Sequence, residues 1–248
     1  MELTDLDRAK YVRQMMIPGF GEEAQRKLKN SSALVTRAGG LGGPTALWLA
    51  CAGIGRLKVA HGGNLTYSNL NRQILMAADW VGKPRADKIR ETLLRMNPDL
   101  DLTVIPEDAH EGNAAELVAD VDIVCDCPPT FAERYALNAA IVARGIPMVE
   151  AAMNSMEGHL TVILPGQTPC LRCIYPEVSE WWSGTSFPVL GAVSGTVGSL
   201  AAVEAIKVLT GFGQPLAGQM LTFDTETQEF RKFKLARWPE CPVCGHLQ

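Results

Sequence analysis

The chain has 248 residues, of which 47% are apolar and 20% charged, and its formal net charge is −4. This length suits one large α/β domain or one domain with a small appendage, and the composition is typical of a soluble globular protein. The acidic balance argues against nucleic-acid or anionic-membrane partners, and with no secretion signal and no apolar run of roughly 20 residues, a cytoplasmic location is expected.

The first 30 residues predict two short helices joined by a turn at residues 18–23. Beyond them, apolar strand-like runs alternate with segments whose apolar residues recur at helical spacing. This alternation predicts an α/β fold with a doubly wound, Rossmann-like, mainly parallel sheet that binds ligands at the carboxyl ends of its strands. The predicted strands are 32–36, 56–61, 100–106, 121–126 and 146–151, and the helices between them are 42–53, 83–97, 113–119 and a segment ending near 144.

After residue 155 the pattern changes to antiparallel strands at 158–165, 218–224 and 229–235, with a long helix at 191–210. The loop before this helix contains Trp181 and Trp182, a pairing typical of a contact surface or a lid. We therefore expect one domain over residues 1–248. It comprises N-terminal helices (1–30), a nucleotide-binding-type α/β half (31–155), and a remainder (156–248) with antiparallel strands, a crossover loop and a cysteine knuckle.

Four of the seven cysteines form two C-x-x-C pairs, Cys170 with Cys173 and Cys241 with Cys244. Without an export signal, this pattern indicates a metal before a disulfide, and four thiolates suit tetrahedral zinc. Four sulfurs close the coordination shell, so the predicted zinc is structural. Unrelated thiols remain the alternative, because the fold must bring the chain's end back to residue 170.

The stretch ALVTRAGGLGGP, residues 33–44, reads as a strand, a glycine-rich turn and a helix start. Such phosphate-binding turns usually follow G-x-G-G-x-G, and Gly39, Gly40 and Gly42 keep that pattern. The first glycine is replaced by Arg37, at a cost of about 1 kcal/mol if the backbone has positive φ. The guanidinium at the mouth of the turn either binds an anion or fills the space of a nucleotide.

Several motifs occur in an order typical of one family: RAGGLGG, SNLNRQIL, GKPRADK, DCPPT, EGHLTV, both C-x-x-C pairs and GSLAAVEAIKVLTG. On these motifs nearly the whole chain resembles the HesA/MoeB/ThiF family, bacterial relatives of ubiquitin-activating enzymes. The resemblance implies a homodimer that uses ATP and magnesium. Its reaction adenylates the C-terminal carboxylate of a small ubiquitin-like sulfur carrier and releases pyrophosphate.

Some family positions are retained. Asn69, Arg72 and Gln73 match the motif N-L-x-R-Q, whose asparagine and arginine face the phosphates in the family. Arg13 matches an arginine that reaches the ATP site of the neighbouring subunit. The resemblance therefore places these residues at the nucleotide, with Arg72 as a catalytic group.

Other family positions have changed. Where the family's second strand ends D-x-D, this chain has His61 and Gly63, and a neutral histidine cannot make a carboxylate's paired contact with the ribose hydroxyls. The family's lysine is Arg85, which keeps the charge but alters its geometry. Lys83 or Lys88 can take the place of that lysine.

The DCPPT stretch departs further. The family motif D-C-T-D-N has a second aspartate that serves magnesium and the reacting phosphates, and Pro129 stands in that place. Asp126 remains at the strand end as the candidate acid. Glu150 and Glu157 are further acids near strand ends, and Glu150 is a candidate general base, cation ligand or ion-pair partner of Arg37, with a structural ion pair favoured.

Three functions stay open. The first is a divergent ATP-dependent adenylyltransferase acting on a sulfur carrier or a small acid. The second is a relative that lost or altered adenylation and uses the basic crevice of Arg37, His61, Arg72 and Arg85 for another anionic metabolite. The third is a non-enzymatic scaffold for a protein partner. A nicotinamide-dependent dehydrogenase fits poorly, because it requires an acid where His61 stands.

Overall fold

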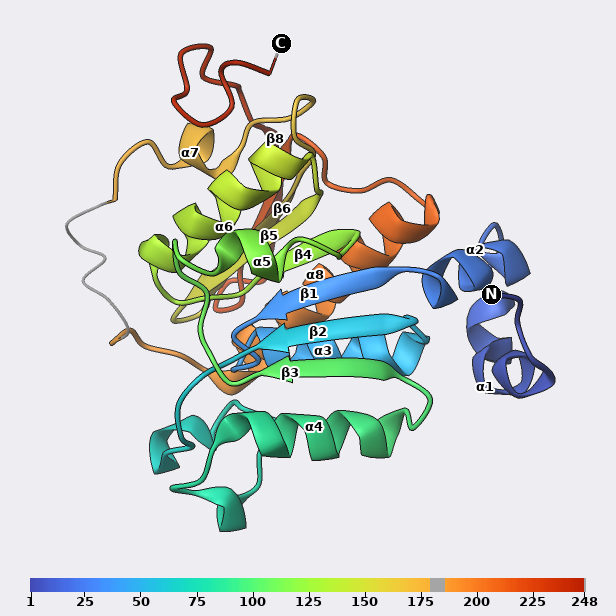
Figure 1. The fold of residues 1–248 in the computed structure, drawn as a ribbon. Coiled ribbons are helices and arrows are strands. Elements are labelled where there is room, and N and C mark those ends of the chain that lie inside the picture. The colour runs from blue at the N-terminus through green and yellow to red at the C-terminus, as the bar shows by residue number, and fades with distance from the viewer. Residues whose placement is uncertain (179–185, 248) are drawn as a thin grey trace.

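The computed structural model describes residues 1–178 and 186–247, and in this part of the chain one eight-stranded sheet has the order β3-β2-β1-β4-β5-β6-β7-β8 (Figure 1). Strands β3 to β5 run parallel, and β5 to β8 are antiparallel neighbours. The strands are β1 (Ser32–Thr36), β2 (Arg56–Ala60), β3 (Asp101–Ile105), β4 (Ile123–Asp126), β5 (Met148–Asn154), β6 (Glu157–Ile163), β7 (Gln219–Asp224) and β8 (Glu229–Lys234).

Helices cover both faces of the sheet and enclose two apolar cores. On one face α3 and α8 pack together, with α4 beside α3; on the other, α5 and α7 pack against α6 (Figure 1). The helices are α1 (Asp5–Met15), α2 (Gly21–Lys29), α3 (Gly42–Ala52), α4 (Arg85–Met96), α5 (Ala114–Leu117), α6 (Phe131–Arg144), α7 (Leu171–Ile174) and α8 (Gly191–Thr210), with the 3-10 turns η1 (Tyr67–Asn69) and η2 (Ala78–Trp80).

The sheet confirms the predicted α/β class with a parallel core and antiparallel C-terminal strands. Its central strand β1 is buried along its whole length, as an apolar run between two helical layers requires. Strand β5 extends to Asn154, three residues beyond the predicted end, because it pairs with β6 over that length. The parallel and antiparallel parts thus share one continuous sheet, joined at the turn between β5 and β6.

Helix α8 contradicts the expectation that no apolar run is long enough for a membrane. By length and composition this helix could cross one. It packs instead on α3, β5 and β6, and its buried residues include the charged Glu204. The Glu204 carboxylate accepts hydrogen bonds from Lys207 Nζ and, at 2.8 Å, from the Leu216 N–H. We interpret α8 as the central core helix of this fold.

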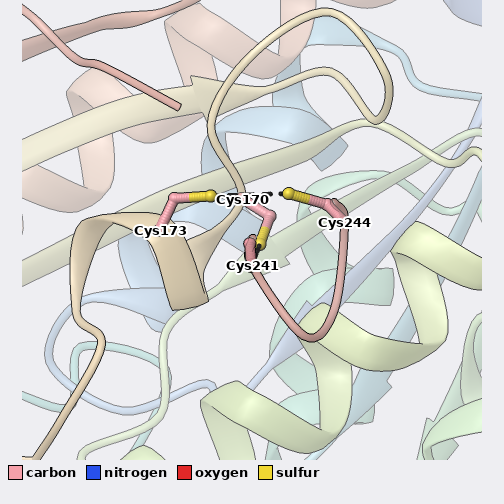
Figure 2. A group of neighbouring side chains, drawn as sticks. All are labelled: Cys170, Cys173, Cys241 and Cys244. Carbon is pink, nitrogen blue, oxygen red and sulfur yellow. Dashed lines mark hydrogen bonds between the residues drawn. The ribbon is translucent and has the colours of Figure 1, made fainter. Parts of the chain in front are cut away.

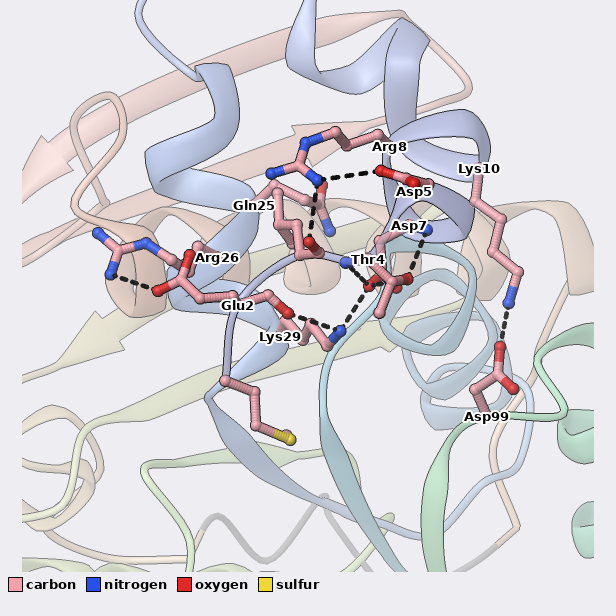
Figure 3. A network of polar contacts seen from close by, with 12 residues as sticks. Glu2, Thr4, Asp5, Asp7, Arg8, Lys10, Gln25, Arg26, Lys29 and Asp99 are labelled. Atoms are coloured by element: carbon pink, nitrogen blue, oxygen red, sulfur yellow. Dashed lines mark hydrogen bonds and ion pairs between the residues drawn. The ribbon is translucent and has the colours of Figure 1, made fainter.

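The two N-terminal helices are tied together and to the sheet by charged contacts (Figure 3). Asp7 accepts hydrogen bonds from the backbone and hydroxyl of Thr4, which closes a capping box on α1. Lys29 at the end of α2 also binds Asp7, and Lys10 pairs with Asp99 in the loop before β3. These contacts leave Arg13 exposed on α1.

Candidate functional site

A cleft lies where the carboxyl ends of β1, β2, β4 and β5 meet, as expected for a doubly wound sheet. Its first wall is the turn from β1 into α3. A Cβ on Gly42 would lie 2.5 Å from the Arg37 carbonyl oxygen, and one on Gly40 would lie 2.8 Å from Ser194 Oγ. Gly42 therefore has no room for a Cβ against the backbone, whereas a Cβ at Gly40 would require the side chains of Ser194 and Arg72 to move. Arg37 has a φ of 59°, so the first position of the turn is left-handed although its residue is not glycine.

Four arginines line this cleft, which has a volume of about 380 Å³. The other polar side chains on its wall are hydroxyl, amide and imidazole groups. Within residues 1–178 and 186–247, no aspartate or glutamate contributes to the lining. The cleft is lined by Arg37, Gly39, Gly40, Leu41, His61, Ser68, Asn69, Arg72, Gln73, Arg85, Cys127, Pro128, Pro129, Arg134, Ala152, Met153, Phe187, Val189 and Ser194.

Among the described residues no carboxylate forms a salt bridge with Arg72 or Arg85, although the nearby charge of Asp108 acts on Arg85 and partly opposes the lowering of its pKa. Arg72 Nη1 donates to the Ser68 carbonyl at 2.7 Å and to Asn71 Oδ1 at 2.9 Å. Arg85 donates to the Gly62 carbonyl at 2.8 Å and to Asn69 Oδ1 at 2.9 Å. Burial lowers the pKa of both guanidinium groups, and the charge of Arg37 adds to this effect at Arg85. Because arginine stays protonated in proteins, both groups offer free charge to an anion.

Arg37 is held by two carboxylates. Its Nε and Nη2 donate to the two oxygens of Glu133 at 2.7 and 3.0 Å, and its Nη1 lies 2.8 Å from Asp108 Oδ2. Glu133 also accepts from Thr130 Oγ1 at 2.7 Å. The proposed ion pair between Arg37 and Glu150 is therefore wrong, since nearer acids from the loop after β3 and from α6 hold the guanidinium. Arg37 forms part of the cleft wall.

Arg134, on α6, pairs with both remaining acids at the strand ends. Its Nη1 lies 3.0 Å from Asp126 Oδ2 and 3.0 Å from Glu150 Oε1. Its Nε and Nη2 donate to the carbonyls of Pro128 and Ala151, both at 2.9 Å. The structural ion pair favoured for Glu150 is thus present, with Arg134 as its partner. No general-base or cation-ligand role for Glu150 follows from this geometry.

Asp126 lies beneath the cleft and does not line it. Its side chain is fully buried, and burial raises the pKa of its carboxyl to about 7 against the opposing charge of Arg134. Magnesium requires oxygen ligands that leave room for several waters. A carboxylate sealed behind a guanidinium does not offer that, and Pro129 has no side-chain oxygen. The residues present therefore do not fit a protein-bound magnesium ion at this cleft.

Three buried polar atoms beside the cleft have no partner among the described residues: His61 Nδ1, Gln73 Oε1 and Arg85 Nε. Burial lowers the pKa of His61 to about 3, helped by Arg85 and Arg37, so the imidazole is neutral at neutral pH. Buried polar groups in proteins are nearly always hydrogen-bonded. Together with two free guanidinium groups, these atoms fit a ligand that carries phosphates and further polar groups, such as a nucleotide.

Two other candidate cations do not reach the cleft. Lys88 Nζ pairs with Glu91 at 2.7 Å and lies over the ring of Trp80, as Lys83 also does. Neither lysine therefore replaces the family's lysine in this arrangement. Arg13, on α1, is not among the lining residues, and its predicted role at a neighbouring subunit stays a prediction.

A second cavity of about 550 Å³ begins where the cleft ends. Ala152 and Met153, near the end of β5, line both spaces. From there the second cavity runs over β5 to β8, where it is bordered by polar groups that include His159, Glu157 and Arg231. The molecule thus presents two adjoining spaces, one rich in arginine and one over the antiparallel strands.

The four cysteines converge, as predicted, at α7 and the chain's end (Figure 2). Their sulfurs all lie within 4.8 Å of one another, with Cys170 and Cys241 at 3.7 Å and Cys173 and Cys244 at 3.4 Å. Tetrahedral zinc–sulfur bonds of about 2.3 Å place sulfurs about 3.8 Å apart. The Asn138 amide donates to Cys170 Sγ at 3.7 Å, and the Trp238 N–H to Cys173 Sγ at 3.5 Å. The cluster therefore suits a metal held by four thiolates.

Three residues of these ion pairs were not predicted from the sequence: Glu133 and Asp108, which hold Arg37, and Arg134, which holds Asp126 and Glu150. One signal was available. Glu133 and Arg134 are adjacent charges in the first turn of a helix that directly follows a buried strand end. Charged residues in such a position are buried only when paired. The predicted Trp181–Trp182 surface falls outside the described residues.

Comparison with known proteins agrees with the fold and motifs. A sequence model of the ThiF family matches residues 11–243. The chain is 52% identical over 246 residues to the heterocyst HesA protein of Trichormus variabilis, covering 99% of this chain and 92% of that protein. It is 40% identical over 251 residues to adenylyltransferase and sulfurtransferase MOCS3 of Drosophila yakuba, covering 98% and 55%. The Escherichia coli MccB structure with MccA-N7isoASN has a similar fold, with a TM-score of 0.85 at 23% identity over 96% of this chain and 74% of that one.

Proposed function

Because the chain belongs to the ThiF family, we propose that it is an ATP-dependent adenylyltransferase that activates a carboxylate. The acceptor is the C-terminus of a ubiquitin-like sulfur carrier or a small acid. MOCS3, an adenylyltransferase by name, is 40% identical to this chain and supports the assignment. The observation that carries the proposal is a pair of guanidinium groups, Arg72 and Arg85, whose hydrogen-bond partners are neutral, in a cleft with buried polar atoms that have no partner among the described residues.

The cleft suits this chemistry because two anions must meet in it. One carboxylate oxygen of the acceptor forms a bond to the α-phosphorus of ATP, and the bond from that phosphorus to the leaving pyrophosphate breaks. Arg72 and Arg85 offset the repulsion between these anions and stabilise the charge on the leaving group. The N-terminal end of α3 adds the partial positive charge of the helix dipole.

The acceptor has a route to this site through the adjoining cavity. Ala152 and Met153 border both spaces, so an extended C-terminal segment lying over β5 to β8 would end at the arginines. A small acid would need only the first space. Neutral His61 can accept one hydrogen bond from the ribose and cannot replace a carboxylate there.

The test is ATP–pyrophosphate exchange with a panel of acceptors that contains a protein ending in Gly-Gly and small carboxylic acids. We expect exchange with one acceptor, reduced by about 10²-fold or more in Arg72→Gln and Arg85→Gln. Arg95→Gln, an exposed arginine of α4 away from the cleft, is the matched control and retains exchange. Absence of exchange with every acceptor, in protein that holds its metal, would remove this function.

A second function is favoured by one observation, the burial of Asp126 behind Arg134. A cleft without an acid and with Pro129 in the family's aspartate position can bind an anionic metabolite without adenylating anything. In that case an acidic small molecule co-purifies with the protein and binds in competition with ATP. A third reading, a non-enzymatic scaffold, predicts partner binding that Arg72→Gln leaves unchanged.

The proposal also covers the metal, the oligomeric state and the location of the protein. We infer a structural zinc ion at the four cysteines, a homodimer and a cytoplasmic location, where thiols stay reduced. An apolar hollow between α3 and α8, bordered by the exposed Trp48, Ile74 and Val203, is the surface we assign to the dimer. Metal analysis by mass spectrometry and sedimentation velocity test these assignments.

A further inference from the structure

We propose that the cleft binds its polyanionic ligand through guanidinium groups alone, with no divalent cation held by the protein. In this arrangement Arg134 is a positioning residue that holds the carboxylates of Asp126 and Glu150 away from the cleft. The identity of the ligand as ATP rests on the proposed function, whereas the anion site itself does not. The proposal makes ligand binding independent of magnesium.

The first support is the placement of the acids around the cleft. Among the described residues, four carboxylates near the cleft are each paired with an arginine: Asp108 and Glu133 with Arg37, and Asp126 and Glu150 with Arg134. Both arginines line the cleft, whereas none of the four acids does. A ligand in the cleft therefore meets guanidinium groups, with the carboxylates behind them.

The second support concerns the oxygens that remain without partners. Asp126 Oδ1 and Glu150 Oε2 are buried and accept no hydrogen bond from the described residues. A divalent ion at these oxygens would lie close to the guanidinium of Arg134, which is 3.0 Å from each carboxylate. Repulsion between the two cations and the loss of the ion's water shell oppose binding there.

The third support is the charge left over for the ligand. Arg72 and Arg85 have neutral hydrogen-bond partners and no salt bridge among the described residues, and only Arg85 is also acted on by a nearby carboxylate, that of Asp108. Guanidinium groups can bind phosphate oxygens in pairs and thereby neutralise charge, one of the tasks that a magnesium ion performs on a polyphosphate.

The experiment is isothermal titration calorimetry of the zinc-loaded protein with two probes, inorganic triphosphate and ATP. Each probe is titrated once in a buffer with excess magnesium and once in a magnesium-free buffer, and neither buffer contains EDTA. Zinc content is measured before and after each titration. We expect both probes to bind, with dissociation constants that differ by less than about threefold between the buffers. Binding of ATP that is about tenfold or more tighter with magnesium would overturn the proposal.

The arms separate this inference from the proposed function. Triphosphate binding without magnesium, together with no ATP binding in either buffer, would support the anion site and remove the adenylyltransferase. ATP binding only with magnesium would remove the magnesium-independent anion site and leave the adenylyltransferase supported. No binding of either probe in either buffer would remove both.

Variants identify the groups responsible. Arg72→Gln should weaken triphosphate binding by about tenfold or more without magnesium, whereas Arg95→Gln should leave it unchanged. Arg134→Gln removes the ion pair of Asp126 and leaves Glu150 with His159 at 3.4 Å, so if it folds, binding should become magnesium-dependent through Asp126. Magnesium-independent binding in folded Arg134→Gln would refute the role of Arg134. If that variant does not fold, the wild-type comparison between buffers still decides the proposal.

Discussion

Replacing Arg37 by glycine separates two opposing contributions that this residue makes to stability. Its φ of 59° is left-handed, which costs about 1–2 kcal/mol for a residue other than glycine. Replacement by glycine relieves this cost, but it also destabilises the folded state by about 0.5–1 kcal/mol because the glycine backbone is freer in the unfolded chain. From the backbone alone, Arg37→Gly should raise the free energy of unfolding by no more than about 1.5 kcal/mol.

The side chain acts in the opposite direction and dominates. Arg37 makes a bidentate pair with Glu133, at 2.7 and 3.0 Å, and a further contact with Asp108. The Glu133 side chain is only 9% exposed, so removing its partner leaves a nearly buried charge. Breaking a buried pair costs about 3–5 kcal/mol, and we take the lower end because Arg37 is 23% exposed and Thr130 still donates to Glu133. Arg37→Gly should therefore destabilise the protein by about 2 kcal/mol.

Urea unfolding of the zinc-loaded protein, followed by far-ultraviolet circular dichroism, measures this difference. The double variant Arg37→Gly with Glu133→Gln removes the stranded charge and should recover about 1 kcal/mol relative to Arg37→Gly. Glu133→Gln alone is the matched control. If Arg37→Gly is as stable as the wild type or more stable, the ion pairs do not hold Arg37 in its left-handed conformation and this reasoning is wrong.

Three further changes test other parts of the structure. Removing the metal with a strong chelator, or Cys173→Ser, should lower the melting temperature by about 10 °C in calorimetry, because a four-thiolate zinc contributes directly to folding; an unchanged melting temperature would contradict the assigned zinc site. Gly63→Ala should cost about 1–2 kcal/mol in urea unfolding, since Gly63 has a φ of 75° and a Cβ there would lie 2.9 Å from Arg85 Nη1; no loss of stability would show that the turn adapts. The folded pKa of Asp126 is raised to about 7, above its unfolded value, so its stabilising contribution is complete below pH 4 and disappears as pH rises through 7. Asp126→Asn should remove this loss of stability, which amounts to up to about 1.4 kcal/mol per pH unit. The measurement is the difference between the stability–pH profiles of the wild type and the variant, in which the contribution of His61 cancels. Parallel profiles would contradict the raised pKa of Asp126.

Much of the frame could be predicted from the sequence, because its signals are local. Apolar runs and helical spacing gave the order of the elements, and helix 191–210 was predicted with the observed bounds. The paired cysteines predicted their own convergence, since each C-x-x-C directs two sulfurs to one point. The glycine pattern also identified residue 37 as a position that tolerates a left-handed backbone, which Arg37 adopts.

The electrostatics of the cleft could not be predicted in the same way, because pairing is decided by tertiary contacts. Arg37 meets Glu133 across 96 positions of the chain, and no local pattern marks that contact. Asp126 ends a strand, as a ligand-binding acid should, yet its direction depends on Arg134 from the following helix. Position on a strand end thus predicts nearness to the cleft, and the partner decides whether the group faces it.

The departures from the family pattern are physically coupled. Gly63 leaves the space that Arg85 Nη1 occupies, and the amide N–H of Arg85 donates to the Gly63 carbonyl at 3.1 Å. Burial is the main cause of the lowered pKa of His61, and the charge of Arg85 lowers it further, so the same change also acts on this imidazole. An aspartate introduced at residue 63 would need to displace this guanidinium in a strained backbone. We therefore expect single reversions toward the family pattern to weaken anion binding in the cleft. Only joint changes at residues 61, 63 and 85 should restore an acid that binds the ribose.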